Sequence, residues 1–555
     1  MLKQEERDSF MRFEEKLKHY SQEEIWAEYC GFLELDMASY MRIQTRLMEE
    51  QIEAFRKSDL GKTLIGRDNP QSIKEFREQF PLTTYQDYAE TLLLKKDEML
   101  PGDAVLWLQT TWEGGRFPIK IAPYTREMLA TFRNNLLACL ILASGKKKGS
   151  FDISPKYHFL YGLAPLPYAT GLFPRALNKE INIAFLPSVK EAETLNFTER
   201  NKKGFKMGAT QGIEYFFGLG SVLYFISMSF SKLVSGGQGG GFEKAKTMSP
   251  TMVFRYLRAK RRCKKEGREM KPKDLFHLKG FMVAGTDNCC YKDELEDLWG
   301  IRPMELFAGT EPTLIGTETW TRDGMVFFPD ACYYEFISEK EMERNELDPS
   351  YNPVTCLMDE VEPGEKYELV VSVLKGGAFM RYRVGDVYRC VTPQNSTEES
   401  RIPRFKYIDR TPDIIDIAGF TRITQGAIEN VIKLSGLAIK DWIAVKEFTP
   451  QNKPQMHIYV EMKKESLATS GMSREILRNH LSIYFKYLDQ DYDDLKKILG
   501  MDPLDITILK CGTFKEYSKS GLGYMRKLNP DSQQVRNLVG IQANVWINGG
   551  GEDSD

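Results

Sequence analysis

Alternating strand and helix patterns between residues 276 and 311 constrain the fold more than any other feature of the sequence. Residues 280–284 and 303–308 are short apolar runs that predict strands, and residues 291–299 between them predict a helix. Units that alternate in this way favour a mostly parallel sheet, whose ligands bind at the carboxyl ends of the strands. The second strand runs directly into Gly309-Thr310-Glu311, so we expect that loop to hold chemistry.

A second strand pattern leads to the stretch RYRVGDV, residues 381–387. Residues 366–374 alternate β-branched and polar side chains and predict a strand, and Lys375-Gly376-Gly377 predicts its turn. An aspartate held just after such strands, with Gly385 allowing close approach of the backbone, suits a bidentate hold on two vicinal hydroxyls such as those of ribose. Turn chemistry alone also explains the pair Gly385-Asp386. Both interpretations stay open on these residues alone.

A third candidate lies at Thr110 to Lys120, after an apolar strand predicted at residues 104–109. A strand followed by hydroxyls, glycines and a lysine is the composition of a loop that cradles phosphate. The ending of a Walker A loop is missing, and a surface turn explains the stretch about as well. The glycine-rich run 235–241 has neither a preceding strand nor a lysine, so we interpret it as a mobile loop.

The length of 555 residues predicts at least two domains. Strand and helix patterns beyond Arg410 form a small α+β unit with its own core, so we place a boundary there. The predicted fold class is α/β: residues 1–410 form a large domain with mixed or parallel sheets and residues 411–555 a smaller α+β domain. Residues 1–65 predict a pair of amphipathic helices that act as a scaffold. The tail from about residue 549 has a disordered composition.

Charge and cysteine content exclude several classes of protein. A formal net charge of -2 argues against a general polyanion binder. The basic segment 255–273 is therefore better explained as a solvated helix face than as a nucleic-acid patch. Nine scattered cysteines without a CxxC pair indicate reduced thiols in a cytoplasmic protein and make a structural zinc site improbable. Neither a secretory signal nor a membrane span is expected, because the N-terminus is highly charged and the uncharged run 215–231 better fits a buried helix.

Several stretches, taken in order, resemble one known family. Residues 80–88 (FPLTTYQDY) look like its N-terminal PLxxYxDY segment, residues 307–311 occupy its aromatic-small-Ser/Thr-Ser/Thr-Glu motif, and residues 333–336 match its YFEF strand. Residues 382–387 reproduce its YRVGDV without a change. The chain thus resembles the Gretchen Hagen type acyl acid-amido synthetases, a branch of the adenylate-forming superfamily, over roughly residues 70 to 530.

The resemblance implies a reaction in two halves that uses ATP and Mg²⁺. A carboxylic acid forms an acyl-adenylate with release of pyrophosphate, and an amine, usually that of an amino acid, then displaces AMP to give an amide. The implied roles are ribose binding for Asp386, an adenine-facing ring for Phe307, and a hydrogen bond to the α-phosphate for Thr310. In full, the implied cofactor-binding residues are Thr110, Thr111, Gly114, Gly115, Lys120, Phe307, Gly309, Thr310, Tyr334 and Asp386, the catalytic residues are Glu311, Arg410 and Lys527, and the metal ligand is Glu311.

Two departures from the family pattern leave alternatives open. The phosphate loop of the family is usually SSGTSxGxxK, whereas this chain has Trp112 and Glu113 in place of its Gly-Thr pair. An indole cannot replace a glycine where backbone must approach phosphate, and a carboxylate repels it. Lys527 lies near a lysine that many members have before Pro-Arg, but here neither follows. A catalytically silent relative that binds a nucleotide or acyl ligand, and a ligase that uses coenzyme A as acceptor, are therefore the alternatives.

Overall fold

The computed structural model describes residues 11–66, 70–110, 119–228, 230, 248–391, 401–410, 414–419, 421–451, 453–463, 474–488, 492, 495, 496, 499 and 501–544. The chain folds into two compact units that meet in sequence at Asp409 and Arg410. Each unit has its own sheet.

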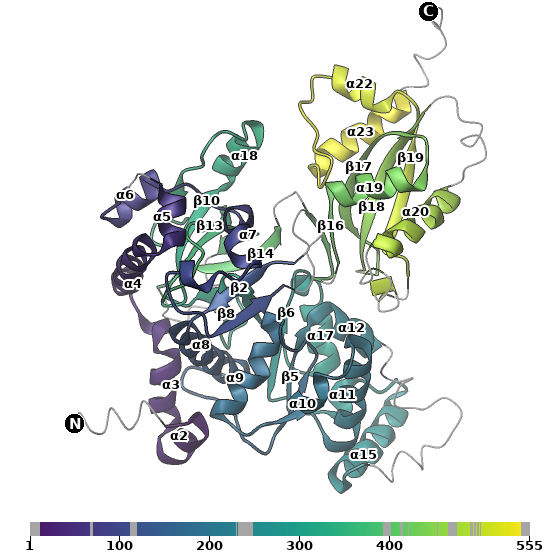
Figure 1. The fold of residues 1–555 in the computed structure, drawn as a ribbon. Helices are drawn as coiled ribbons and strands as arrows, with labels where there is room; N and C mark the ends of the chain where they lie inside the picture. The colour runs from purple at the N-terminus through teal and green to yellow at the C-terminus, as the bar shows by residue number, and fades with distance from the viewer. Residues whose placement is uncertain are drawn as a thin grey trace, which may run out of the picture. The chain divides into compact units, whose positions relative to one another are not determined.

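The first unit is built on a mixed sheet (Figure 1). Strands in the order β4-β3-β5-β6-β7 pair in parallel, as the alternating pattern of residues 276–311 predicts. The pairs β7 to β8 and β8 to β9 are antiparallel, as are those of β9 with β14, β13 with β12, and β10 with β12 and β11. The strands are β3 His158–Tyr161, β4 Ala184–Leu186, β5 Tyr215–Leu219, β6 Gly280–Ala284, β7 Met304–Gly309, β8 Thr313–Glu318, β9 Met325–Phe327, β10 Cys332–Ser338, β11 Thr355–Cys356, β12 Lys366–Val373, β13 Tyr382–Val391 and β14 Arg404–Arg410.

Helix α8 (Arg126–Ser144) forms the centre of the core because it is apolar on nearly every side. It begins where Thr125 accepts a hydrogen bond from the Met128 amide, and it packs against β6 and β8. Around the sheet lie α9 Leu172–Glu180, α10 Val189–Ala192, α11 Phe197–Gln211, α12 Gly220–Met228, α15 Pro250–Glu266, α16 Pro272–Leu275, α17 Lys292–Trp299 and α18 Glu339–Leu347.

The N-terminal helices are more numerous than the predicted pair. Residues 13–65 form four α-helices, because Asp36 and Ser58 each cap a new helix and η1 (Gly31–Glu34) interrupts the second. These helices are α2 Phe13–His19, α3 Gln22–Cys30, α4 Met37–Lys57 and α5 Asp59–Ile65, and they are followed by α6 Ile73–Gln79 and α7 Tyr85–Leu93. Helix α4 packs against β10, so this segment does form part of the scaffold.

The uncharged run 215–231 is not one helix, contrary to our expectation. Its first five residues are strand β5, which lies between β3 and β6, and helix α12 begins only at Gly220. A short apolar run fits a buried strand and a buried helix equally well, so periodicity could not separate them. Among the described residues, no helix combines the length and the apolar character needed to cross a bilayer.

The second unit, which begins at Arg410, is a small α+β structure. Its sheet has β18 (Pro454–Met462) in the centre, antiparallel to β17 (Ile439–Phe448) and parallel to β19 (Leu504–Leu509). A hairpin of β15 (Ile414–Ile417) and β16 (Thr421–Thr424) precedes this sheet. The helices are α19 Gln425–Ser435, α20 Arg474–Leu488, α22 Thr513–Lys519 and α23 Ser532–Asn544.

Candidate active site

A two-stranded hairpin carries the described ends of the expected phosphate loop. Strand β1 (Leu106–Gln109) pairs with β2 (Ile121–Tyr124), and Thr110 and Lys120 face each other just beyond the paired residues. The Thr110 amide donates to the Lys120 carbonyl at 2.9 Å, and the Lys120 amide donates to the Thr110 hydroxyl at 3.0 Å. The base of the loop is therefore fixed. Thr111, Gly114 and Gly115, like Trp112 and Glu113, lie outside the described residues.

Three of the sequence motifs meet at Lys120, Glu311 and Tyr382, a group that we call the Lys120 junction. Lys120 Nζ lies 3.2 Å from Glu311 Oε1, and the Tyr382 hydroxyl donates to the same oxygen at 2.7 Å. Lys120 Nζ also lies 3.3 Å from the Tyr382 hydroxyl and 5.7 Å from the centre of the Tyr85 ring. The junction joins residues that are 191 and 71 positions apart in the sequence.

The turn after β7 presents Glu311 to this junction. Gly309 pairs with Thr313, so Thr310 to Pro312 form the tip of the β7–β8 hairpin at the carboxyl end of β7. A Cβ on Gly309 would approach Pro312 Cδ to 2.8 Å, so this tight turn requires a glycine. The Tyr124 hydroxyl donates to the Thr310 carbonyl at 2.9 Å, and burial, together with the nearby Glu311 carboxylate, raises the pKa of Tyr124. Thr310 and Glu311 thus lie in the turn at the carboxyl end of β7.

Asp386 lies inside a strand, not after a strand pair or in a turn as expected. Glu368 pairs with Val387 and Val370 pairs with Arg383, so residues 384–386 of β13 bulge opposite Leu369 alone. Gly385 has a φ of 81°, which a residue with a side chain rarely adopts, and this explains the glycine. The bulge aims Asp386 into the protein, where it is only 1% exposed.

Aromatic rings connect Asp386 with Phe307. The Tyr407 hydroxyl lies 3.5 Å from Asp386 Oδ1, and the Tyr407 ring packs edge-on against Tyr388 at 5.6 Å. Tyr388 in turn packs edge-on against Phe307 at 5.6 Å. The residues expected to hold ribose and adenine therefore belong to one packed cluster.

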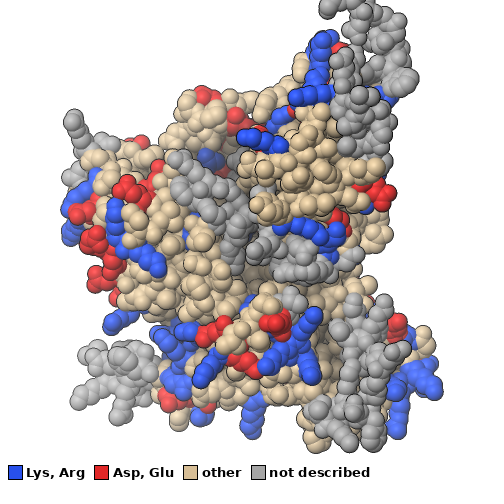
Figure 2. Space-filling model, turned by 45° about the vertical axis from the view of Figure 1, so that its right-hand side comes forward, with Lys and Arg blue, Asp and Glu red and all other residues tan. Residues whose placement is uncertain are grey.

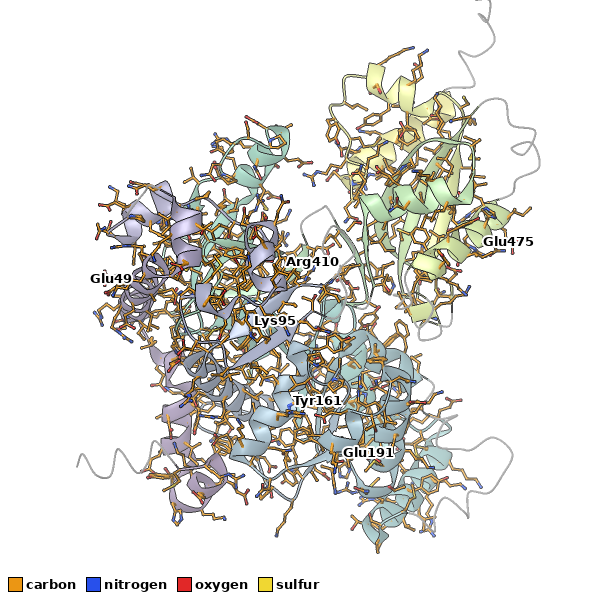
Figure 3. All side chains as sticks on the ribbon, viewed as in Figure 1. Glu49, Lys95, Tyr161, Glu191, Arg410 and Glu475 are labelled. Carbon is orange, nitrogen blue, oxygen red and sulfur yellow. The ribbon has the colours of Figure 1, made fainter. Side chains whose placement is uncertain are left out.

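The second unit holds the other two expected catalytic residues. Arg410, labelled in Figure 3, has its Nε 4.0 Å from Asp416 Oδ2, a fully buried carboxylate that also accepts from Arg422 Nε at 3.1 Å. Lys527 forms an ion pair with Asp441 and lies over the rings of Trp442 and Phe514 at 5.8 and 5.6 Å.

Comparison with known proteins agrees with these motifs. Residues 325–410, which span β9 to β14 and contain YRVGDV, match a model described as the GH3 family central domain. This segment is similar to the GH3 family. It is 29% identical over 204 residues to jasmonoyl-L-amino acid synthetase GH3.5 of Oryza sativa subsp. japonica and 26% identical over 196 residues to indole-3-acetic acid-amido synthetase GH3.15 of Arabidopsis thaliana. Each match covers 34% of this chain and 32% of the relative, so the chain spans about a third of the length of the curated relatives it matches.

A solved structure supports the fold of this chain. A crystal structure of 2-hydroxyisobutyryl-CoA ligase with 2-HIB-AMP and CoA is similar at a TM-score of 0.52 and 15% identity, over 91% of this chain and 92% of that one. The predicted α/β fold of the adenylate-forming enzymes is thus confirmed.

Tyr334 lies in the core and makes no contact with the Lys120 junction, so its assignment to nucleotide binding stays a prediction. Its ring is 1% exposed and packs on Phe327, and its hydroxyl donates to the Phe328 carbonyl at 2.7 Å. Strand β10 points this side chain into the core, where burial raises the pKa of the hydroxyl. A nucleotide could reach it only if the core opened.

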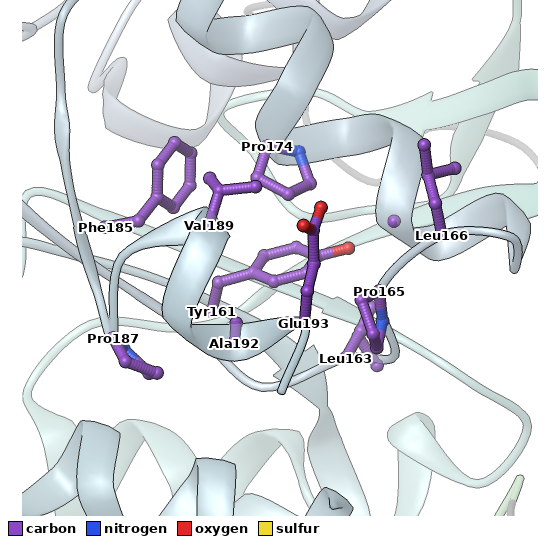
Figure 4. A pocket seen from close by; sticks show the side chains of 11 residues that line it. Tyr161, Leu163, Pro165, Leu166, Pro174, Phe185, Pro187, Val189, Ala192 and Glu193 are labelled. Atoms are coloured by element: carbon purple, nitrogen blue, oxygen red, sulfur yellow. The ribbon is translucent and has the colours of Figure 1, made fainter. Parts of the chain in front are cut away.

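An apolar pocket lies at the carboxyl ends of β3 and β4 (Figure 4). Its volume is about 330 Å³ with its open mouth included, and Tyr161, Leu163, Pro165 and Phe185 contribute to its walls. None of the described residues of the uncharged run 215–231 lines it. The Gln109 amide, at the end of β1, donates to the Pro167 carbonyl at 3.0 Å, one residue beyond the pocket lining, so the wall is connected to the strand that precedes the expected phosphate loop.

Sequence reasoning missed the contact of Tyr382 with Glu311. The residue is part of the quoted YRVGDV motif, and its hydroxyl connects that motif with Glu311. Tyr85, from the quoted PLxxYxDY segment, was missed as well: the Ile121 amide, next to Lys120, donates to its hydroxyl at 2.6 Å. The position of each tyrosine inside a motif was the available signal.

Proposed function

We propose that this chain is an ATP- and Mg²⁺-dependent ligase that activates a carboxylic acid as an acyl-adenylate and transfers the acyl group to an amine such as an amino acid. The Lys120 junction is the observation that carries the proposal. A phosphate-loop lysine, the glutamate of the β7 turn and the tyrosine of YRVGDV converge within 3.3 Å of one another. A purely structural fold needs no such meeting of three motifs at the carboxyl end of a parallel strand.

In the first half-reaction, a carboxylate oxygen of the acid attacks the α-phosphorus of ATP, and pyrophosphate leaves. Lys120 and the Thr110 hydroxyl are the groups at the loop base that can meet phosphate oxygens. Phe307 offers its ring to adenine, and Gly309 lets the backbone approach the nucleotide. Thr310 donates a hydrogen bond to the α-phosphate. Asp386 accepts hydrogen bonds from the ribose hydroxyls. Because Asp386 is 1% exposed, ribose must displace a covering side chain to reach it.

The residues present fit a magnesium ion held mainly by substrate. The described residues contain no group of three or more His, Cys, Asp or Glu side chains suited to a metal. Mg²⁺ in nucleotide sites is usually bound through one or two carboxylates plus phosphate oxygens, and Glu311 supplies one carboxylate. Lys120 and Tyr382 both contact Oε1, so neither of them occupies Oε2. When bound, the ion would neutralise charge that develops on the phosphates.

In the second half-reaction, the amine nitrogen attacks the acyl carbon, AMP leaves, and a proton from the amine passes to solvent. We assign residues 1–410 to the adenylation domain and residues 411–555 to a small mobile domain whose rotation excludes water from the adenylate. Arg410 and Lys527 would then supply cations to the nucleotide. Their present partners, Asp416 and Asp441, must release them for that role. We also retain the cytoplasm as the expected location.

Pyrophosphate exchange tests the proposal on the full chain. Incubation with ATP, Mg²⁺, labelled pyrophosphate and a panel of carboxylic acids should return label to ATP, and AMP release with amino acids or with coenzyme A then identifies the acceptor. The altered phosphate loop motivates the rival proposal of a silent relative. Absence of exchange with every acid, together with ATP binding in calorimetry, would favour that rival.

Asp386→Ala tests the ribose assignment. We expect at least a 100-fold loss of exchange, because two hydrogen bonds from the ribose to a charged group are lost. Asp330→Asn is the matched control, since Asp330 pairs with Lys375 at 3.1 Å and takes no part in the junction. Undiminished exchange in Asp386→Ala would refute the assignment while leaving the activity in place.

A further inference from the structure

Helix α15 presents apolar side chains on the side that faces away from the protein. Met252, Ala259 and Cys263 form its packed side. Phe254 is 67% exposed and Leu257 is 48% exposed, and both lie on the opposite side at 100° per residue. Large apolar side chains exposed together at the centre of a solvent-facing surface mark an interaction site.

The outward side of α15 and its flanks carry a dense group of cations. Arg258, Lys260, Arg261, Lys264 and Lys265 are all exposed, and none forms an ion pair with a residue that the structure describes. Figure 1 places α15 at the lower edge of the first unit. Figure 2 shows Lys and Arg side chains, interspersed with Asp and Glu, along the lower part of the visible face. Five unpaired cations on one helix contrast with a net charge of -2 for the whole chain.

The packed side of α15 fixes this surface in place. Asp274, just beyond the helix, forms ion pairs with Arg262 and Arg268, and its carboxylate accepts from the Lys271 amide at 2.9 Å. These ion pairs of Asp274, which we call the anchor of α15, use Arg262 and Arg268. The five outward cations therefore remain available.

We propose that the outward side of α15, comprising Phe254, Leu257 and the five cations, docks on an anionic lipid surface. The cations contact lipid headgroups, and the two apolar side chains enter the boundary between headgroups and acyl chains. A helix that lies in the interface with basic and large apolar side chains is the device by which peripheral proteins bind such surfaces. This inference does not depend on the proposed ligase activity.

The combination of side chains favours lipid over the other polyanions. Nucleic acid is bound through cations at phosphates, and an exposed leucine adds nothing to those contacts. An acidic protein surface would satisfy the charges but would need its own apolar groove for Phe254 and Leu257. A lipid surface supplies charge and an apolar layer together.

Co-sedimentation of the full chain with vesicles tests the proposal. We expect binding to vesicles that contain phosphatidylserine, little binding to pure phosphatidylcholine, and weakening as salt rises. Lys260→Gln/Arg261→Gln/Lys264→Gln should lower partitioning about fivefold per cation. Phe254→Ser/Leu257→Ser should lower it at least tenfold at fixed salt.

Matched controls separate docking from general charge effects. Arg46→Gln/Lys57→Gln/Lys62→Gln removes three exposed cations of α4 and α5, and Leu347→Ser removes an apolar side chain that is 81% exposed on α18. Both should leave partitioning unchanged. The proposal fails if the α15 variants bind vesicles like the parent or if the apolar pair has no effect on vesicle binding. It also fails if the full chain binds single-stranded DNA as tightly as it binds the vesicles.

Discussion

Strand β7 lies between two groups in which a lysine contacts glutamate, and the two groups differ in character. Near its start, Lys292 is enclosed by Glu305 and Glu318, with Nζ at 2.9 and 2.6 Å from their oxygens. Beyond its end, Lys120 meets Glu311 at 3.2 Å beside the expected phosphate loop. The Lys292 side chain is 8% exposed and the Lys120 side chain is 17% exposed.

The two groups differ in how many of their carboxylate oxygens already accept a hydrogen bond or an ion pair. Glu318 accepts from Lys292 and, through its other oxygen, from the Glu305 amide at 2.7 Å, so this group is closed. Burial, with Glu318 nearby as a like charge, raises the pKa of Glu305. At the Lys120 junction both donors use the one oxygen Oε1. A closed group stabilises the fold, whereas an incompletely used group can exchange partners with a ligand.

Removal of Lys292 should have the largest effect on stability. Lys292→Met leaves two buried carboxylates without their cation, so we expect the free energy of unfolding to fall by about 3–5 kcal/mol in urea denaturation. Lys271→Met is the control, because Lys271 pairs with Asp297 at the surface and such pairs contribute about 0–1 kcal/mol. Equal losses in the two variants would contradict the closed character of the Lys292 group.

Removal of Lys120 should lower pyrophosphate exchange strongly and stability only slightly. Lys120→Met should reduce pyrophosphate exchange on the order of 100-fold, because a cation for the phosphates is lost, while the free energy of unfolding changes by about 1 kcal/mol or less. Lys120→Arg retains the charge and should recover part of the rate. A variant that loses stability as severely as Lys292→Met while its folded fraction keeps full exchange would show that Lys120 has only a structural role.

Local signals in the sequence predicted the elements, and long-range pairing defined the site. Thr125 and Ser72 cap helices as their residue types indicate, and the strands on either side of α17 follow from their apolar runs. The contact of Tyr382 with Glu311 depends on the register of β13 in the sheet, which no local pattern encodes. The bulge at Gly385 was mistaken for a turn for the same reason, since a glycine with positive φ serves both. The family resemblance supplied the motifs but not these contacts.

Asp274 belongs to a third group of charged side chains, in which a buried carboxylate forms ion pairs with two partly exposed arginines. Its expected effect on stability is smaller. Burial raises the pKa of Asp274, but hydrogen bonds from Arg268, the Lys271 amide and Arg262 outweigh it and hold the pKa well below its ordinary value. A lowered pKa means that the contribution to stability is present above about pH 4 and is lost as pH falls towards the folded-state pKa. Asp274→Asn should therefore cost about 1–2 kcal/mol at pH 7, less than a closed group because the arginines are 46% and 32% exposed. Urea midpoints measured from pH 7 down to pH 3 should show the gap between parent and variant narrowing below about pH 4. A gap that stays constant across this range would mean that the anchor of α15 depends on packing and not on the charge of Asp274.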